Sequence, residues 1–143
     1  MDDNLSKLYR GLIFEHDKAP LFYEKRVDAG HVVDAYNPLC GDKFKLYLDI
    51  ENQVLVSATF PGYGCAVSKA AASVLMKKIQ DQPLNQVSEI LNQFLAVIAA
   101  GPESTNTDPE TAAFALAKNF PGRDKCATLS WQALSNYLRN QNL

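Results

Sequence analysis

The sequence contains little cysteine, and its cysteines are not arranged in closely spaced pairs. There are three in 143 residues, at positions 40, 65 and 126, and no Cys-x-x-Cys pair occurs. An odd number of cysteines without a short-loop framework is not the pattern of a disulfide-rich secreted domain. We therefore expect a reducing, cytoplasmic compartment for this protein.

Three further absences exclude classes of function. The net charge is −2, so the chain lacks the excess of basic side chains that would neutralise the phosphates of a nucleic acid. No apolar run approaches the roughly 18–20 residues of a membrane span. The first residues, Met1 to Asn4, are acidic and lack the basic-then-apolar pattern of a secretory signal. The sequence thus predicts a protein that binds neither nucleic acids nor membranes.

The sequence does contain the two periodicities of a mixed fold. Hydrophobic residues make up 47% of the chain, which predicts one domain over residues 1–143 with a sizeable core. Apolar and polar residues alternate over 43–50 and 54–60, and a further strand is expected over 32–36. Helical stripes cover 5–13, 67–79, 87–98 and 127–138, with a shorter helix near 112–118. Short connections favour an antiparallel meander. We therefore expect an α+β fold with a three-stranded antiparallel sheet packed against several helices.

Two residues of these helices are given structural roles. Trp131 lies on the apolar stripe of the last helix, so we expect it in the core. His16 lies at the polar end of the first helix, where a solvated side chain is a more common outcome than a ligand or an acid–base group.

The loop at residues 37–42 has the composition of half a metal site. Pro38 stops the preceding strand, and Gly41 provides backbone freedom between Cys40 and Asp42. In an extended segment, side chains two residues apart leave on the same side. A thiolate and a carboxylate that converge in this way could supply two of the four ligands of a tetrahedral zinc site.

The other two cysteines share one setting. Cys65 and Cys126 each follow a break that contains Pro and Gly, and each opens a predicted helix. Free N–H groups and the helix dipole favour the thiolate there. Three loops would then present Cys40, Asp42, Cys65 and Cys126 at one end of the sheet. Arg123 could hydrogen-bond to a sulfur or carboxylate, while Lys43 and Lys125 could offset the excess negative charge.

Spacing alone leaves a second interpretation open. Cysteine is often buried as a small apolar residue, and these three lie 25 and 61 residues apart. The Gly62-Tyr63-Gly64 segment lacks the third glycine of a dinucleotide-binding fingerprint.

The same three segments resemble a known family. Asn-Pro-Leu-Cys-Gly-Asp at 37–42, Gly-Tyr-Gly-Cys-Ala-Val-Ser at 62–68 and Arg-Asp-Lys-Cys-Ala-Thr-Leu-Ser-Trp at 123–131 are similar to the cysteine blocks of the IscU/SufU iron–sulfur cluster assembly family. The resemblance covers nearly the whole chain. It is closest to the SufU branch, because IscU scaffolds have histidine where this chain has Lys125, and because the segment between Cys65 and Cys126 is long.

The resemblance implies a function and a ligand set. It implies zinc bound by Cys40, Asp42, Cys65 and Cys126, and a partner that is a SufS-type, PLP-dependent cysteine desulfurase. The implied activity is sulfurtransfer, in which persulfide sulfur is accepted and passed toward downstream iron–sulfur assembly proteins. The mechanistic hypothesis is that docking frees Cys40 from zinc to attack the enzyme persulfide, while Arg123 orients the sulfur.

Two alternatives remain at this stage. The chain could be a scaffold on which a [2Fe–2S] cluster is built, although Lys125 in place of histidine leaves only four candidate ligands. It could also be a relative that keeps zinc as a structural element. Asp42 and Arg123 argue against that, since closed structural sites are usually made of Cys and His alone.

Overall fold

In a computed structural model, the described residues are 3–39, 41–102 and 108–143, with side chains described from Ser6 onward. Three longer antiparallel strands form most of the sheet: β1 (His31–Asn37), β2 (Asp42–Glu51) and β3 (Val54–Thr59). Two-residue strands extend it: β4 (Gly62–Tyr63) pairs with β2, and β5 (Gln82–Pro83) pairs with β3. The predicted meander is confirmed, and two short strands are added to it.

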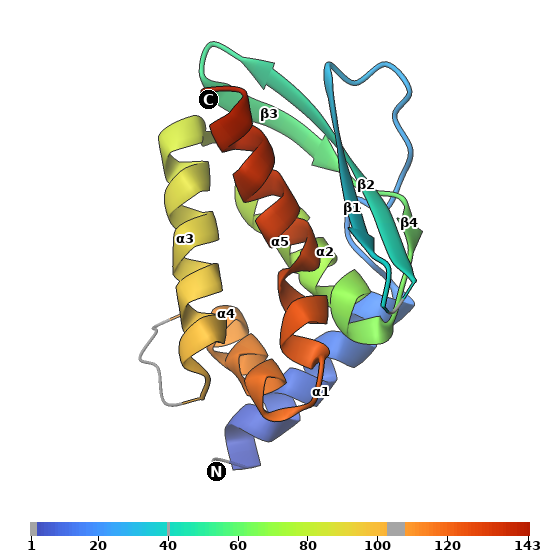
Figure 1. The fold of residues 1–143 in the computed structure, drawn as a ribbon, viewed down its shortest axis with the longest axis vertical. Helices are drawn as coiled ribbons and strands as arrows, with labels where there is room; N and C mark the ends of the chain where they lie inside the picture. Colours follow the sequence, from blue (N-terminus) through green and yellow to red (C-terminus); the bar gives the residue numbers. More distant parts are fainter. Residues whose placement is uncertain (1–2, 40, 103–107) are drawn as a thin grey trace.

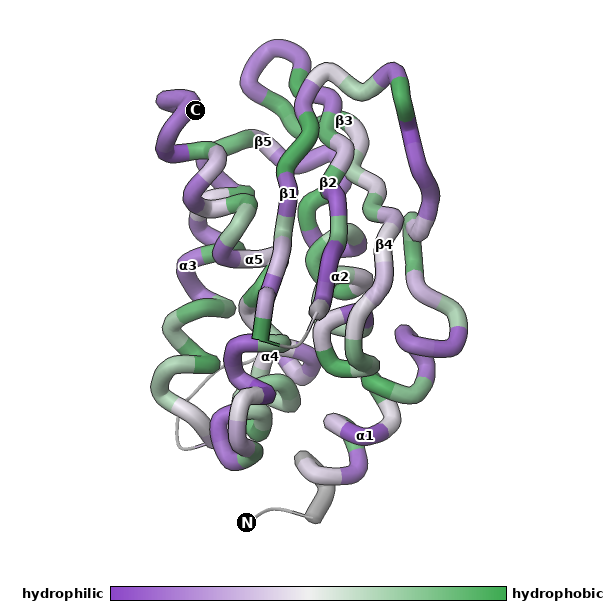
Figure 2. Tube along the Cα trace, turned by 45° about the vertical axis from the view of Figure 1, so that its right-hand side comes forward, coloured by the Kyte–Doolittle hydropathy of each residue, from purple (hydrophilic) through white to green (hydrophobic). Residues whose placement is uncertain are grey.

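The helices cover one side of this sheet. They are α1 (Asp3–Lys18), α2 (Ala66–Ile79), α3 (Leu84–Ala100), α4 (Pro109–Phe114) and α5 (Arg123–Asn140), with a 3-10 turn, η1 (Ala115–Asn119), after α4. In Figure 1, α2 and α5 lie between the sheet and α3, and α1 crosses below them. Within the described residues, β1 has no strand on its outer side (Figure 2).

The strands form where the alternation predicts them. In β2, Phe44, Leu46 and Leu48 are fully buried, while Lys43 and Lys45 are exposed. These three apolar side chains pack into the core formed with α2, whose residues are mostly buried. Small residues in α2, such as Ala70 and Ala71, permit the close approach of helix and sheet.

Trp131 is a central residue of the core, as predicted. Its side chain is fully buried in α5 and stacks on Phe94 of α3, with ring centroids 3.6 Å apart. Its indole N–H donates to the carbonyl oxygen of Ala71 at 2.9 Å. The buried polar atom of the indole is therefore satisfied, and α2, α3 and α5 meet at this residue.

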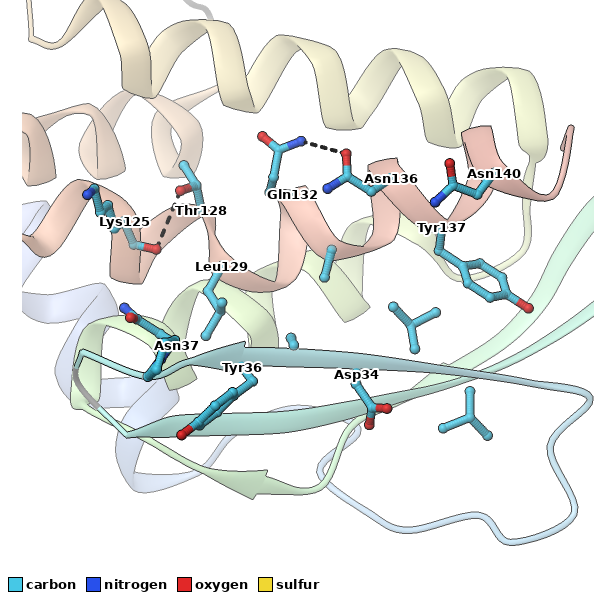
Figure 3. Close-up of a pocket in the computed structure, with 15 residues that line it drawn as sticks. Asp34, Tyr36, Asn37, Lys125, Thr128, Leu129, Gln132, Asn136, Tyr137 and Asn140 are labelled. Atoms are coloured by element: carbon cyan, nitrogen blue, oxygen red, sulfur yellow. Dashed lines mark hydrogen bonds between the residues drawn. The ribbon is translucent and has the colours of Figure 1, made fainter.

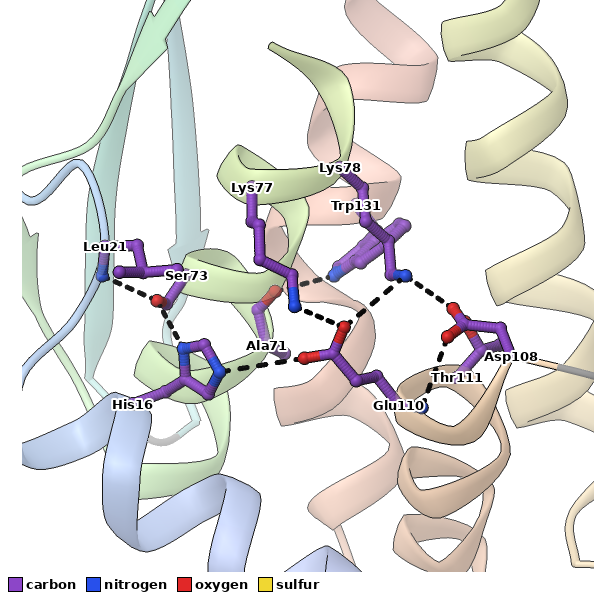
Figure 4. Close-up of polar contacts among 10 residues, drawn as sticks. All are labelled: His16, Leu21, Ala71, Ser73, Lys77, Lys78, Asp108, Glu110, Thr111 and Trp131. Carbon is purple, nitrogen blue, oxygen red and sulfur yellow. Dashed lines mark hydrogen bonds and ion pairs between the residues drawn. The ribbon is translucent and has the colours of Figure 1, made fainter.

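The prediction for His16 is wrong. The side chain is buried, its Nδ1 lies 2.7 Å from the hydroxyl oxygen of Ser73, and its Nε2 lies 3.8 Å from Oε2 of Glu110 (Figure 4). The Ser73 oxygen also accepts from the N–H of Leu21 at 2.7 Å. Because α2 and α4 fold over the end of α1, a position that is polar in sequence becomes an interior junction.

Candidate metal centre

Three of the predicted donors meet at one end of the sheet. Asp42 is the first residue of β2 and pairs with Asn37 of β1. Cys65 is the N-cap of α2, and Cys126 lies in the first turn of α5. One sulfur from each cysteine and one carboxylate oxygen of Asp42 all lie within 4.8 Å of one another. This is a spacing from which three atoms can bind a single ion.

Burial differs among the three donors. Asp42 and Cys126 are each about 1% exposed, whereas Cys65 is partly exposed. The cluster is therefore open to solvent on the side of Cys65. Cys40 lies outside the described residues, and its neighbours Leu39 and Gly41 are exposed.

Hydrogen bonds set the positions of Asp42 and Cys65. Oδ1 of Asp42 accepts from the backbone N–H of Cys65 at 2.8 Å, which ties the start of β2 to the start of α2. The sulfur of Cys65 in turn accepts from the N–H of Ser68 at 3.4 Å, in the manner of an N-cap. The predicted environment of Cys65 is thus present.

Gly64 allows this close approach. A Cβ atom on residue 64 would lie 2.8 Å from Oδ1 of Asp42 and 2.9 Å from the ring of Phe44. Glycine is therefore needed at position 64 because the Asp42 carboxylate and the Phe44 ring leave no room for a side chain. This explains the Gly62-Tyr63-Gly64 segment without dinucleotide binding.

One atom of the cluster has no internal partner. Oδ2 of Asp42 is buried and accepts no hydrogen bond from the described residues. An unsatisfied buried acceptor costs about 1–3 kcal/mol. A cation held by the Asp42 carboxylate and the two sulfurs could satisfy it. The chemistry of the residues, two thiolates and a carboxylate, therefore fits a divalent metal such as zinc.

Arg123 interacts with the sulfur atoms, as the sequence suggested. A hydrogen bond to Cys126 and the negative charge of Cys65 raise the pKa of the Arg123 guanidinium above its usual range. Lys43 and Lys125 have exposed side chains. Arg123 is thus the cation that the structure associates with the cluster.

Tyr9 of α1 is a neighbour that the sequence patterns did not single out as a site residue. Burial raises the pKa of its phenol to about 12, Arg123 opposes this, and the charges of Cys65 and Cys126 add to it. Its ring stacks on Phe120 at 5.9 Å, just before Arg123 in the chain. Its helical spacing marked it only as a core residue, because nothing local to α1 shows that its phenol is close enough to feel the charges of the two cysteines.

Comparison with known proteins agrees with this geometry. The family profile described as the NifU-like N terminal domain matches residues 8–135. The chain belongs to this family. The resemblance to IscU/SufU proteins is therefore confirmed, and with it the α+β fold.

Two relatives and one solved structure illustrate the relationship. The NifU-like chain is 33% identical to the "zinc-dependent sulfurtransferase SufU" of Bacillus subtilis, over 92% of this chain and 89% of that protein. It is 26% identical to the "iron-sulfur cluster assembly scaffold protein IscU" of Thermotoga maritima, over 92% and 93%. A crystal structure titled as a putative scaffold protein for the SUF system, from Fervidobacterium islandicum, superposes with a TM-score of 0.81 at 26% identity, over 91% and 96%.

One further finding concerns the NifU-like chain as a whole. Among its described residues, no helix combines the length and the apolar character that crossing a membrane requires.

Proposed function

We propose that this protein is a zinc-dependent sulfurtransferase of iron–sulfur cluster assembly. It accepts persulfide sulfur on Cys40 from a SufS-type, PLP-dependent cysteine desulfurase in the cytoplasm, and passes it to downstream assembly proteins. The observation that carries the proposal is the cluster of Asp42, Cys65 and Cys126, whose donor atoms lie within 4.8 Å of one another. The similarity to the Bacillus subtilis sulfurtransferase supports the choice of reaction.

The four proposed ligands are Cys40, Asp42, Cys65 and Cys126. Zinc bound by them would hold the sulfurs as thiolates and shield them from oxidation. Cys65 and Cys126 suit a permanent holding role, because each is fixed at the start of a helix. Cys40 suits the reacting role, because the adjacent Gly41 gives the backbone of the 37–42 segment conformational freedom.

In the transfer step, the Cys40 thiolate attacks the outer sulfur of the desulfurase persulfide. A new sulfur–sulfur bond forms on Cys40, the sulfur–sulfur bond of the donor breaks, and the donor cysteine leaves as a thiolate, so no outside oxidant or reductant is needed. Arg123, which contacts Cys126, carries the positive charge that would stabilise the anionic sulfur atoms as they exchange.

A scaffold that builds a [2Fe–2S] cluster on the same residues is the second candidate. The IscU relatives, named as scaffold proteins, favour it. Against it, the residue before Cys126 is Lys125, which cannot serve as the additional ligand that a histidine there would provide.

Metal analysis of the purified protein is the first test. We expect about one zinc per chain, weakened or lost in Cys40→Ser, Cys65→Ser, Cys126→Ser and Asp42→Ala. Iron, with charge-transfer absorption after anaerobic reconstitution, would favour the scaffold. A protein that binds no metal, and whose four variants behave like the parent, would contradict the shared site.

Sulfur transfer is tested with labelled cysteine and a SufS-type desulfurase. Label is expected on the peptide that contains Cys40 and not on those with Cys65 or Cys126, and Cys40→Ser should abolish it. The other two cysteine peptides serve as internal controls. If Cys40→Ser accepted as much sulfur as the parent, Cys40 could not be the acceptor.

A further inference from the structure

A groove of about 590 Å³ runs between β1 and α5, outside the three-donor cluster (Figure 3). One wall is the outer side of β1, where no other strand pairs with it among the described residues. The opposite wall is the exposed face of α5. The groove is thus bounded by a sheet edge and a helix, which are two different kinds of hydrogen-bonding surface.

The register shows which backbone groups face the groove. The N–H of Lys45 donates to Pro61 at 3.1 Å, on the side of β2 away from β1. Backbone groups alternate in direction along an antiparallel strand. The backbone N–H and C=O of Leu46 therefore point toward its partner, Val33 of β1. Asp34, the partner of Lys45, then points its own N–H and C=O outward. The same alternation places the backbone groups of Val32 and Tyr36 on the outer edge.

This edge lacks the usual protection against strand pairing. Sheet edges are commonly blocked by proline, a bulge or an unpaired charge. The pairing of β1 with β2 is continuous over all seven residues, and β1 contains no proline. Its one acidic residue, Asp34, forms an ion pair with Lys45 at 2.9 Å. Val32 and Tyr36 are exposed beside it.

The α5 wall has a spacing that suits an extended chain. Gln132, Asn136 and Asn140 line the groove at intervals of four residues, above a floor that includes Leu129 and Ala133. Four residues of helix advance about 6 Å. Two residues of extended chain advance about 6.6 Å, which is the repeat of backbone groups on one side of a strand. Each amide can therefore meet one repeat of a strand placed between α5 and β1.

The amides are already ordered. Nε2 of Gln132 donates to Oδ1 of Asn136 at 3.1 Å, and Arg139 donates to the same oxygen at 2.5 Å. This arrangement leaves the carbonyl oxygen of Gln132 and the amino group of Asn136 available to a binding partner (Figure 3). The wall thus offers both an acceptor and a donor, which is what a peptide backbone requires.

We propose that this groove binds an extended segment of a partner polypeptide, which adds to β1 as a further strand and contacts the α5 amides with its other edge. The central residues of the segment are uncharged, because the lining charges are Asp34, which is already paired with Lys45, and, at the end that carries Asn37, Lys125. This inference goes beyond the proposed function, since neither a metal nor sulfur transfer is needed for it.

A second copy of the chain fits the groove less well than a single segment. Every copy carries its own α5 beside its own β1. Edge-to-edge pairing of two β1 strands would bring two α5 helices to the same junction. A lone extended chain has no such helix and needs only the space between one strand and one helix.

The test uses a phage-displayed library of random linear peptides as long as β1, seven residues. Peptides enriched on the parent protein are synthesised with a fluorescent label, and their affinities are measured by anisotropy. Asp34→Pro removes an outward N–H and leaves the ladder to β2 intact, while Gln132→Ala/Asn136→Ala removes the amides. Each is expected to weaken binding at least about tenfold.

Matched variants separate recognition from a loss of fold. Asp34→Ala removes the same side chain but keeps the N–H, and Gln86→Ala/Gln93→Ala removes two exposed amides of α3; both should bind as the parent does. Amide chemical shifts should change at residues 32, 34 and 36 on binding. Failure to enrich any peptide, equal binding by parent and Asp34→Pro, or a parental dimer that Asp34→Pro dissociates in light scattering would each overturn the proposal.

Discussion

Asp42 shows how one residue serves both the fold and the candidate centre. One carboxylate oxygen accepts from the backbone of Cys65, and the other is buried without a partner among the described residues. The first contact aligns β2 with α2, and the second leaves a buried oxygen on a residue whose carboxylate lies close to two sulfurs. Stability and metal binding should therefore respond differently to a change in this side chain.

Asp42→Asn keeps an oxygen for the Cys65 N–H but removes the negative charge. In the presence of a chelator, we expect this variant to be about 1–2 kcal/mol more stable than the parent, because a neutral amide costs less to bury without a partner than a charged carboxylate does. With zinc added, the order should reverse, because the parent gains binding free energy. Urea unfolding under both conditions measures the effect. Equal zinc stabilisation of the two proteins would remove Asp42 from the ligand set.

Gly64→Ala tests the close packing around the same carboxylate. The added Cβ would lie 2.8 Å from Asp42 Oδ1, so we expect a loss of about 1–3 kcal/mol in unfolding free energy and weaker zinc binding. Gly11→Ala is the control, since a Cβ there meets no atom within 4 Å and α1 should gain about 0.5–1 kcal/mol. If the Gly64→Ala protein were as stable as the parent, a Cβ atom at position 64 would not be crowded by Asp42.

At the scale of elements, a polar network joins α1, α2 and α4 (Figure 4). Its centre is His16, which contacts Ser73 of α2 and Glu110 of α4. Glu110 also pairs with Lys77 at 2.5 Å. Because the Ser73 oxygen already accepts from Leu21, its own O–H is free to donate to Nδ1 of a neutral imidazole. The network therefore fits the uncharged form of His16.

The stability of this junction should depend on pH. Burial lowers the pKa of His16 below its ordinary value of 6.5, and the nearby Glu110 only partly opposes this. The unfolded chain takes up the proton first, so stability is complete above pH 6.5 and is lost as the pH falls toward the folded pKa. Urea midpoints from about pH 8 to about pH 5 measure this loss. In His16→Asn the decline should be smaller, and an identical decline would assign it to other groups.

At the scale of the whole molecule, Trp131 connects the inner and outer helix layers. It stacks on Phe94 of α3 and donates to Ala71 of α2 while lying in α5 itself. The same helix, α5, carries Arg123 and Cys126 at its start and lines the β1 groove along its length. The position of α5 in the core therefore sets the geometry of both surfaces.

Trp131→Phe should destabilise the fold by about 1–3 kcal/mol, because stacking area and the bond to Ala71 are lost. Phe14→Leu is the matched aromatic control; Phe14 is 66% exposed, so its change should stay within about 0.5 kcal/mol. Urea unfolding compares the two. A loss confined to the control would show that Trp131 is not a central packing residue.

Much of this architecture could be predicted from local patterns in the sequence. Alternation in 43–50 and 54–60 predicted β2 and β3, and the stripe through Trp131 predicted a buried face of α5. The breaks before Cys65 and Cys126 correctly placed both at helix starts. These features depend on neighbours a few residues away, where periodicity and capping act.

Tertiary structure decided what distant residues do to one another. It placed donor atoms of Asp42, Cys65 and Cys126 within 4.8 Å of one another. It also buried His16 between Ser73 and Glu110, and it set α5 beside the open edge of β1. It also added β4 and β5, which are too short to show any alternation. Such contacts join segments tens of residues apart, so they follow from how the elements pack and not from the periodicity within any one of them.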